Sequence, residues 1–250
     1  MERPSLFLAA QQLKPFIGKT IEQVSGNTKS GKEQLEGKKV LDLFSWGKHL
    51  VFQFPTFAVR IHFLLFGSFE ATVQDKSVTG DYKKKARVPR LAFTFKNGHM
   101  EMYSCSVKFI ESANAKAEYD FSVDLMSDAW NPVQALRNVR KKPREEIADV
   151  LLDQTIFAGL GNIIKNEILF LAKVKPTTLI GQIPLSKLKE LIAWAKQFSL
   201  QFYKWRKKFV LRKNLKVHRK GICPLCGYKL LRAKTGKRQR WSYYCLVDQA

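Results

Sequence analysis

The sequence predicts an α+β multidomain protein with a β-rich N-terminal part, a helical middle part and a small C-terminal module built on cysteine. Apolar residues alternate with a period of two through about the first 110 positions, as half-buried strands require. Near Trp130 the period changes to about 3.6, the period of an α-helix. Three of the four cysteines lie close to the end of the chain. We therefore expect a domain boundary near residues 125–130.

The composition points to a polyanionic partner. The 250 residues, 45% of them hydrophobic, suffice to bury a core in more than one domain. The formal net charge of +23 repels itself and favours an anionic partner, for which nucleic acid is the leading candidate. No run of about 18 apolar residues and no signal-peptide layout is visible. We expect a cytoplasmic monomer, nucleoid-associated if bacterial, with no membrane partner.

Two hairpins are predicted in the β-rich part. From Val40 to Phe54, two apolar runs flank residues 45–48, and the second run alternates as a half-buried strand does. The second hairpin alternates from Leu91 to Phe95 and leads into Asn97-Gly98. Asn-Gly supplies the positive φ angles of a type I′ turn, so we expect the chain to reverse there.

One strand and a polar connection are expected between the hairpins. The strand runs from Ala58 to Phe66, and the connection runs from Gln74 to Arg87. The connection contains Lys83-Lys84-Lys85, which could contact phosphate.

Helical periodicity predicts four helices after the boundary: Pro132 to Val139, Arg144 to Leu152, Ile163 to Ala172, and Leu185 to Trp205. The apolar and aromatic residues of the last helix share one face, which favours a core position over base stacking. Residues 204–220 carry nine Lys or Arg and no acid. Such a run is often only a solvated face, but here it joins helices to a metal module, so we expect contact with DNA phosphates.

The C-terminal cysteines have the spacing of a metal site. Cys223, Cys226, Cys245 and Asp248 form the pattern C-x2-C-x18-C-x2-D, which a hairpin can close around one tetrahedral zinc. Cysteine is the expected fourth ligand, although an aspartate oxygen can also bind zinc. Cys105 stands alone in a strand-like stretch, and we interpret it as a buried, inert thiol.

A glycine-rich turn precedes the third predicted helix. Residues 159–162, Gly-Leu-Gly-Asn, open into that helix, and the backbone N–H groups and the Asn162 amide suit a phosphate oxygen. An ordinary turn is the simpler interpretation of this motif when it is taken alone.

Taken together, these segments resemble the formamidopyrimidine-DNA glycosylase and endonuclease VIII family over nearly the whole chain. The resemblance rests on Leu151-Leu152-Asp153-Gln154, Gly159-Leu160-Gly161-Asn162, Asn166-Glu167-Ile168-Leu169, the β-rich start and the cysteine hairpin. It implies a β-sandwich over residues 1–127, a helix-two-turn-helix domain over 128–215 and a zinc-finger hairpin over 216–250. Double-stranded damaged DNA would lie in a positive cleft between the first two.

The resemblance implies a base-excision-repair glycosylase that is also an abasic-site lyase and flips its target base out of the duplex. The family uses an N-terminal proline amine as nucleophile and a neighbouring glutamate to move protons. Here Met1 occupies the proline position and Glu2 the glutamate position. Either the α-amine of Met1 forms the Schiff base, or the protein only binds damaged or abasic DNA. An RNA-binding or ribosome-associated protein is a third hypothesis, which the charge alone permits.

Other family positions carry over one by one. Lys48 matches a hairpin lysine that reaches phosphate beside the lesion, and we count it with Met1 and Glu2 as catalytic. The remaining residues match positions that contact DNA. They are His62, Leu65 in place of a methionine that fills the space of the flipped base, Lys108 as a partial substitute for an intercalating arginine, Asn162, and Arg240 as a phosphate-gripping finger residue.

Overall fold

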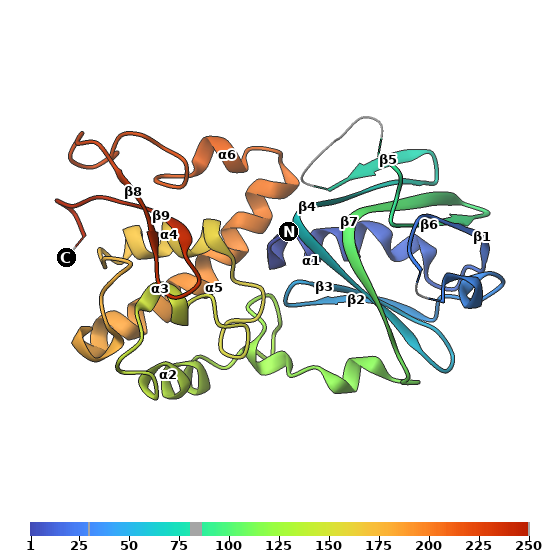
Figure 1. The fold of residues 1–250 in the computed structure, drawn as a ribbon, viewed down its shortest axis with the longest axis horizontal. Coiled ribbons are helices and arrows are strands. Elements are labelled where there is room, and N and C mark those ends of the chain that lie inside the picture. Colours follow the sequence, from blue (N-terminus) through green and yellow to red (C-terminus); the bar gives the residue numbers. More distant parts are fainter. Residues whose placement is uncertain (30, 81–86, 250) are drawn as a thin grey trace. The chain divides into compact units, whose positions relative to one another are not determined.

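The computed structural model describes residues 1–29, 31–80 and 87–249 (Figure 1). The chain divides into two compact units, Met1–Asp120 and Phe121–Ala250. The helices that follow residue 120 and the cysteine hairpin share the second unit. In the described residues, no helix combines the length and apolar character that crossing a membrane requires.

The first unit is built on a seven-stranded sheet of order β1-β6-β7-β4-β3-β2, with β5 paired to β4. Its strands are β1 (Ile21–Ser25), β2 (Asp42–Trp46), β3 (His49–Gln53), β4 (Ala58–Val73), β5 (Lys76–Thr79), β6 (Leu91–Phe95) and β7 (Gly98–Ile110). The expected α+β class and the first predicted hairpin are confirmed, because β2 and β3 are joined by the two residues Gly47 and Lys48.

The long strands β4 and β7 fold the sheet into two layers. The first part of β4, residues 58–63, pairs with β3, whereas residues 70–73 pair with β5. The register between β4 and β7 shifts between Phe63 and Ser68, where the layers change. Phe52 and Phe93 come from different layers, and their rings meet edge to face at 5.5 Å. The two layers therefore enclose one core, as a sandwich does.

Helix α1 (Arg3–Leu13) was not predicted. Eight of its eleven residues are buried, so it shows little of the one-sided apolar stripe by which a surface helix is recognised. It packs against β2 and β3, and Figure 1 shows it crossing the sheet. Leu6 and Leu13 are fully buried in the core of the unit.

The predicted type I′ turn at Asn97-Gly98 is wrong by one residue. Phe95 pairs with Gly98, so Lys96 and Asn97 form the turn, and neither has a positive φ. Gly98 has φ 147°, and a Cβ there would lie 1.9 Å from the carbonyl oxygen of Thr72. Glycine is therefore required by close approach to β4. Lys83-Lys84-Lys85 lie outside the described residues.

The second unit contains the helices α2 (Pro132–Arg140), α3 (Ile147–Val150), α4 (Asn162–Leu171), α5 (Leu185–Lys207) and α6 (Leu211–Asn214). Three predicted helices are confirmed as α2, α4 and α5. The helix predicted from Arg144 to Leu152 is wrong in length. Glu146 forms a β-bridge with Leu179, and the N–H of Ile147 donates to the carbonyl of Thr178, so the chain is extended before α3 begins.

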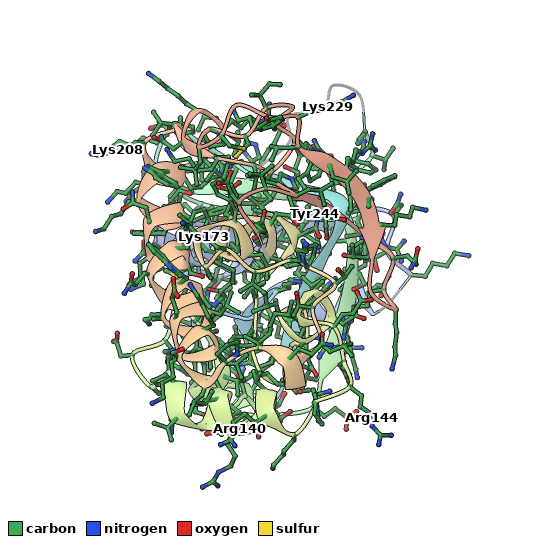
Figure 2. All side chains as sticks on the ribbon, turned by 90° about the vertical axis from the view of Figure 1, so that its left-hand side faces the viewer. Arg140, Arg144, Lys173, Lys208, Lys229 and Tyr244 are labelled. Carbon is green, nitrogen blue, oxygen red and sulfur yellow. The ribbon has the colours of Figure 1, made fainter. Side chains whose placement is uncertain are left out.

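Short 3-10 helices connect these elements: η1 (Lys14–Phe16), η2 (Lys32–Leu35), η3 (Ala115–Glu118), η4 (Phe121–Val123) and η5 (Ile180–Gln182). The strands β8 (Leu231–Thr235) and β9 (Arg240–Tyr244) form the C-terminal hairpin, and β9 lies beside α4 (Figure 1). Figure 2 shows the side chains of Lys208, Arg140 and Arg144 projecting outward from this unit.

Candidate functional site

The start of the chain is fixed against the first unit. The carbonyl oxygen of Glu2 accepts hydrogen bonds from the N–H groups of Ser5 (3.1 Å) and Leu6 (3.2 Å), so Glu2 caps α1. The buried guanidinium of Arg3 donates to the hydroxyl of Ser45 on β2 at 2.6 Å. Met1 is half-buried and packs against the core. These contacts hold the first two residues at a defined place beside β2.

Lys48 lies at the tip of the β2–β3 hairpin. The preceding Gly47 has φ 51°, which glycine adopts without strain and which lets a two-residue turn close the hairpin. Trp46 anchors the base of this turn, because its indole Nε1 donates to the carbonyl of Asp120 at 2.8 Å. The hairpin therefore holds the backbone at Lys48 in a tight, supported turn.

Two histidines lie beside this hairpin. His49 on β3 pairs with His62 on β4, and their ring centroids are 5.3 Å apart. Burial, followed by the positive charges of Arg60 and His62, lowers the pKa of His49 to about 4. Burial also lowers the pKa of His62, and the positive charges of the N-terminal amine, Lys48 and Arg60 add to that effect. The amine of Met1 and the ammonium of Lys48 are therefore both within electrostatic reach of His62.

The shift in β4 exposes three apolar side chains. Leu64, Leu65 and Phe66 have exposed fractions of 50%, 69% and 50%. Gly67 closes this irregular segment, since a Cβ there would lie 2.7 Å from the Ser104 carbonyl oxygen and 2.8 Å from the Leu64 nitrogen. The backbone thus presents Leu65 to the surroundings.

Lys108 lies within β7 and pairs with Arg60 of β4, so it projects from a regular strand. It lines a surface pocket together with Arg60 and Glu118. Cys105, on the same strand, is confirmed as a buried thiol, and burial raises its pKa to about 12.

In the second unit, the glycine-rich turn holds the start of α4. Gly159 has φ 90°, and its N–H donates to the side-chain oxygen of Gln154 at 2.9 Å. The amide Nδ2 of Asn162 donates to the carbonyl of Trp241 at 2.8 Å. Asn162 thus joins α4 to β9 next to Arg240, which is exposed.

Buried polar side chains of α4 form hydrogen bonds with β9 and with residues 216–218. Lys165 has no exposed surface, and its ammonium donates to Ser242 at 2.7 Å. Glu167 is also fully buried and accepts hydrogen bonds from the N–H groups of Lys216 (2.7 Å), Val217 (3.0 Å) and His218 (2.8 Å). Burial raises the pKa of Glu167 despite these bonds.

The tip of the hairpin is held by two acids that precede α4. The N–H of Gly236 donates to Glu146 at 2.9 Å, and the N–H of Lys237 donates to Asp149 at 2.6 Å. Gly236 has φ 68°, and a Cβ there would lie 2.4 Å from the Asp149 carboxylate. The two carboxylates therefore accept hydrogen bonds from backbone N–H groups of the turn that precedes Arg240.

The four predicted metal ligands come together. One ligand atom each of Cys223, Cys226, Cys245 and Asp248 lies within 4.8 Å of all the others. Zinc–sulfur and zinc–oxygen distances of about 2.3 and 2.1 Å place the ligand atoms of a tetrahedral ion about 3.5–3.8 Å apart, which lies within this limit. The N–H of Leu225 points at the Cys223 sulfur (3.4 Å), which is a contact that favours a thiolate. The donor set therefore fits a divalent metal such as zinc.

Sequence patterns gave no signal for several residues that shape these places. Asp149 has the appearance of an ordinary polar residue in a helical segment, and Trp46 and His49 that of ordinary strand residues. Glu167 belongs to a motif that carries the resemblance, but the motif does not indicate which groups its carboxylate binds. Only the packing of distant segments against them reveals their roles.

Comparison with known proteins agrees with the fold. A family model described as the formamidopyrimidine-DNA glycosylase H2TH domain matches residues 123–200. Endonuclease 8-like 3 of Xenopus laevis is 27% identical over 229 residues, covering 90% of this chain and 37% of that protein. The chain thus spans little more than a third of that relative's length. Formamidopyrimidine-DNA glycosylase of Lactobacillus delbrueckii is 25% identical, covering 99% of this chain and 98% of that protein.

Two solved structures have the same fold over the full chain. A viral DNA glycosylase has a TM-score of 0.85 with 20% identity, and each chain is covered completely. Lactococcus lactis formamidopyrimidine-DNA glycosylase, bound to DNA that contains an abasic site, has a TM-score of 0.84 with 21% identity, covering 100% of this chain and 99% of that one.

Proposed function

We propose that this chain is a member of the formamidopyrimidine-DNA glycosylase and endonuclease VIII family and acts as a base-excision-repair DNA glycosylase with abasic-site lyase activity. Its partner would be damaged double-stranded DNA. The proposed working parts are the β-sandwich over 1–127, the helix-two-turn-helix domain over 128–215 and the zinc-finger hairpin over 216–250.

One arrangement supports the catalytic part of the proposal. Arg3 holds the start of the chain to Ser45 of β2, and Lys48 directly precedes His49, which pairs with His62. The positive charges of the N-terminal amine and of Lys48 also lower the pKa of His62, as expected if the three groups lie in one region of the first unit. An α-amine has a reference pKa of about 7.7–8.0, so part of it is unprotonated and nucleophilic at neutral pH. Glu2 is the adjacent carboxylate.

The proposed reaction begins when the Met1 amine attacks C1′ of the damaged nucleotide. The bond between C1′ and the base breaks, the sugar ring opens at O4′, and a C=N bond forms. The two protons lost by the amine pass, with Glu2 as the carrier, to the leaving base and to O4′. Glu2 then removes a proton from C2′, the C3′–O bond breaks and the 3′ strand leaves as a 5′-phosphate. Water hydrolyses the C=N bond and restores the amine.

DNA binding is proposed to rest on phosphate contacts and on one apolar side chain that enters the base stack. Lys48, His62, Asn162, Arg240 and the basic run after α5 would hold the backbone, and affinity should fall steeply with salt as counterions are released. Exposed Leu65 would fill the space left by the flipped base. Lys108 is proposed to contact the backbone as a cation, since it lies within a regular strand.

Cys223, Cys226, Cys245 and Asp248 are proposed to bind a structural zinc ion. When bound, zinc would cross-link the two ends of the hairpin segment and so fix Arg240. The fit rests on the clustering of the four ligand atoms.

The proposal is tested with duplexes that contain one abasic site or one oxidised base. We expect wild-type protein to nick the abasic duplex, and the Glu2→Gln and Lys48→Ala variants to lose about 100-fold or more in rate. Lys189→Ala, which removes an exposed charge on α5, is the matched control and should keep full rate. Binding of abasic DNA without any nicking would leave only the damage-binding hypothesis.

A further inference from the structure

The outer face of the β8–β9 hairpin carries an aromatic ring among cations. Lys234 pairs directly with Trp241, and Arg232 pairs with Tyr243, so these four side chains share one face of the ribbon. The guanidinium carbon of Arg232 lies 4.0 Å from the centroid of the Trp241 ring, and the Lys234 ammonium lies 5.6 Å from it. The indole nevertheless keeps 39% of its surface exposed.

The opposite face of the hairpin is already occupied. Thr235, Ser242 and Tyr244 are buried on that side, and Ser242 accepts from Lys165 of α4. Asn162 holds the backbone of Trp241 from the same helix. The hairpin is therefore fixed on α4, and the Trp241 face is left toward the surroundings as a rigid platform.

The charged side chains of the hairpin itself are all cationic. No acidic residue occurs between Glu190 and Asp248, whereas Arg232, Lys234, Lys237 and Arg238 all lie on the hairpin. A rigid indole beside a guanidinium and an ammonium is the combination on which unpaired bases stack while the cations meet the phosphates. Inside a paired duplex the base faces are covered by their stacked neighbours, so only the two terminal base pairs could meet such a platform.

We propose that the Trp241 face is a second nucleic-acid site, which takes an unpaired segment of DNA by stacking a base on the indole beside Arg232. This site lies on the face of the ribbon opposite to the side that packs on α4. It goes beyond the proposed glycosylase chemistry and does not depend on Met1. Its natural ligand would be a frayed end, a bubble or a single-stranded stretch.

The test measures binding of the full chain to labelled (dT)12 and to a blunt 12-base-pair duplex by fluorescence anisotropy. Trp241→Leu keeps an apolar side chain but removes the π system, and we expect it to weaken (dT)12 binding about tenfold. Trp241→Phe keeps a ring and should stay within about threefold of wild type. Duplex affinity should remain within about twofold for both variants, and nicking of the abasic duplex should be unchanged.

Equal weakening of single-strand and duplex binding, or no weakening of either, would overturn the proposal. Tighter binding of U12 than of (dT)12, with the loss confined to U12, would contradict the assignment to DNA. Cross-linking provides a measurement that needs no variant. Wild-type protein irradiated with an oligonucleotide that carries 5-iodouracil should give an adduct on the peptide that contains Trp241, and an adduct on other peptides alone would overturn the site.

Discussion

Replacing Glu167 by glutamine should destabilise the second unit strongly although the side chain keeps its size. One carboxylate oxygen accepts from the N–H groups of Val217 and His218, and the other accepts from Lys216. In the Glu167→Gln variant the single amide oxygen can occupy only one of these two acceptor positions. The amide NH2 then faces an N–H donor, so at least one buried donor loses its acceptor.

The magnitude follows from the number of bonds affected. An unsatisfied buried N–H costs about 1–3 kcal/mol, and the bonds that remain lose the charge that strengthens them. We therefore expect a loss of about 2–4 kcal/mol in the free energy of unfolding. For a unit of this size, that corresponds to a fall in Tm of roughly 10 °C.

Scanning calorimetry and urea unfolding of the full chain measure this loss. Glu190→Gln is the matched control, because Glu190 is partly exposed and pairs with Lys187 at the surface, where an ion pair contributes about 0–1 kcal/mol. If Glu167→Gln were as stable as Glu190→Gln, the three backbone hydrogen bonds would not be what holds residues 216–218 to α4.

Three further outcomes are expected. The pKa of His49 is about 4 in the folded protein and about 6.5 in the unfolded chain, so the unfolded chain binds more protons as the pH falls. Acidification from pH 7 to pH 5 should therefore lower the free energy of unfolding of the first unit by up to about 2 kcal/mol. A His49→Gln variant should lose most of this pH dependence in unfolding titrations. Gly67→Ala should cost about 1–3 kcal/mol and weaken binding of abasic DNA, because its Cβ meets backbone on two sides, and unchanged Tm and affinity would refute that packing. Chelation of metal should lower the Tm of wild-type protein, and Asp248→Ala should reduce bound zinc measured by atomic absorption, whereas an equal zinc content would exclude Asp248 as a ligand.

Local patterns were sufficient for segments whose apolar residues recur at a regular spacing. In α2 and α5 that spacing reflects one side that faces water, whereas β3, β6 and α4 are buried on nearly all sides and were identified from the spacing alone. Helix α1 is buried nearly all round, so it carries little periodic signal. The turn at residues 96–97 was misplaced because Gly98 is required by contact with Thr72, a long-range constraint that its neighbours in sequence do not reveal.

The residues of the candidate sites also divide into those that the sequence identified and those that it did not. The spacing of the cysteines identified the metal cluster, because short loops alone bring C-x2-C and C-x2-D sulfur and oxygen atoms together. The supporting residues Asp149, Lys165 and Glu167 could not be predicted. Each makes the hydrogen bonds described here with a segment at least 49 positions away, which only the folded chain brings near.

The central claim is that the first amine of the chain attacks a sugar carbon, and trapping tests it most directly. Full-length protein would be incubated with an abasic duplex and sodium borohydride, and the covalent product would be digested and mapped by mass spectrometry. The account predicts one adduct, on the N-terminal peptide at the α-nitrogen of Met1. An adduct on a lysine instead, or none at all with enzyme in large excess, would contradict it.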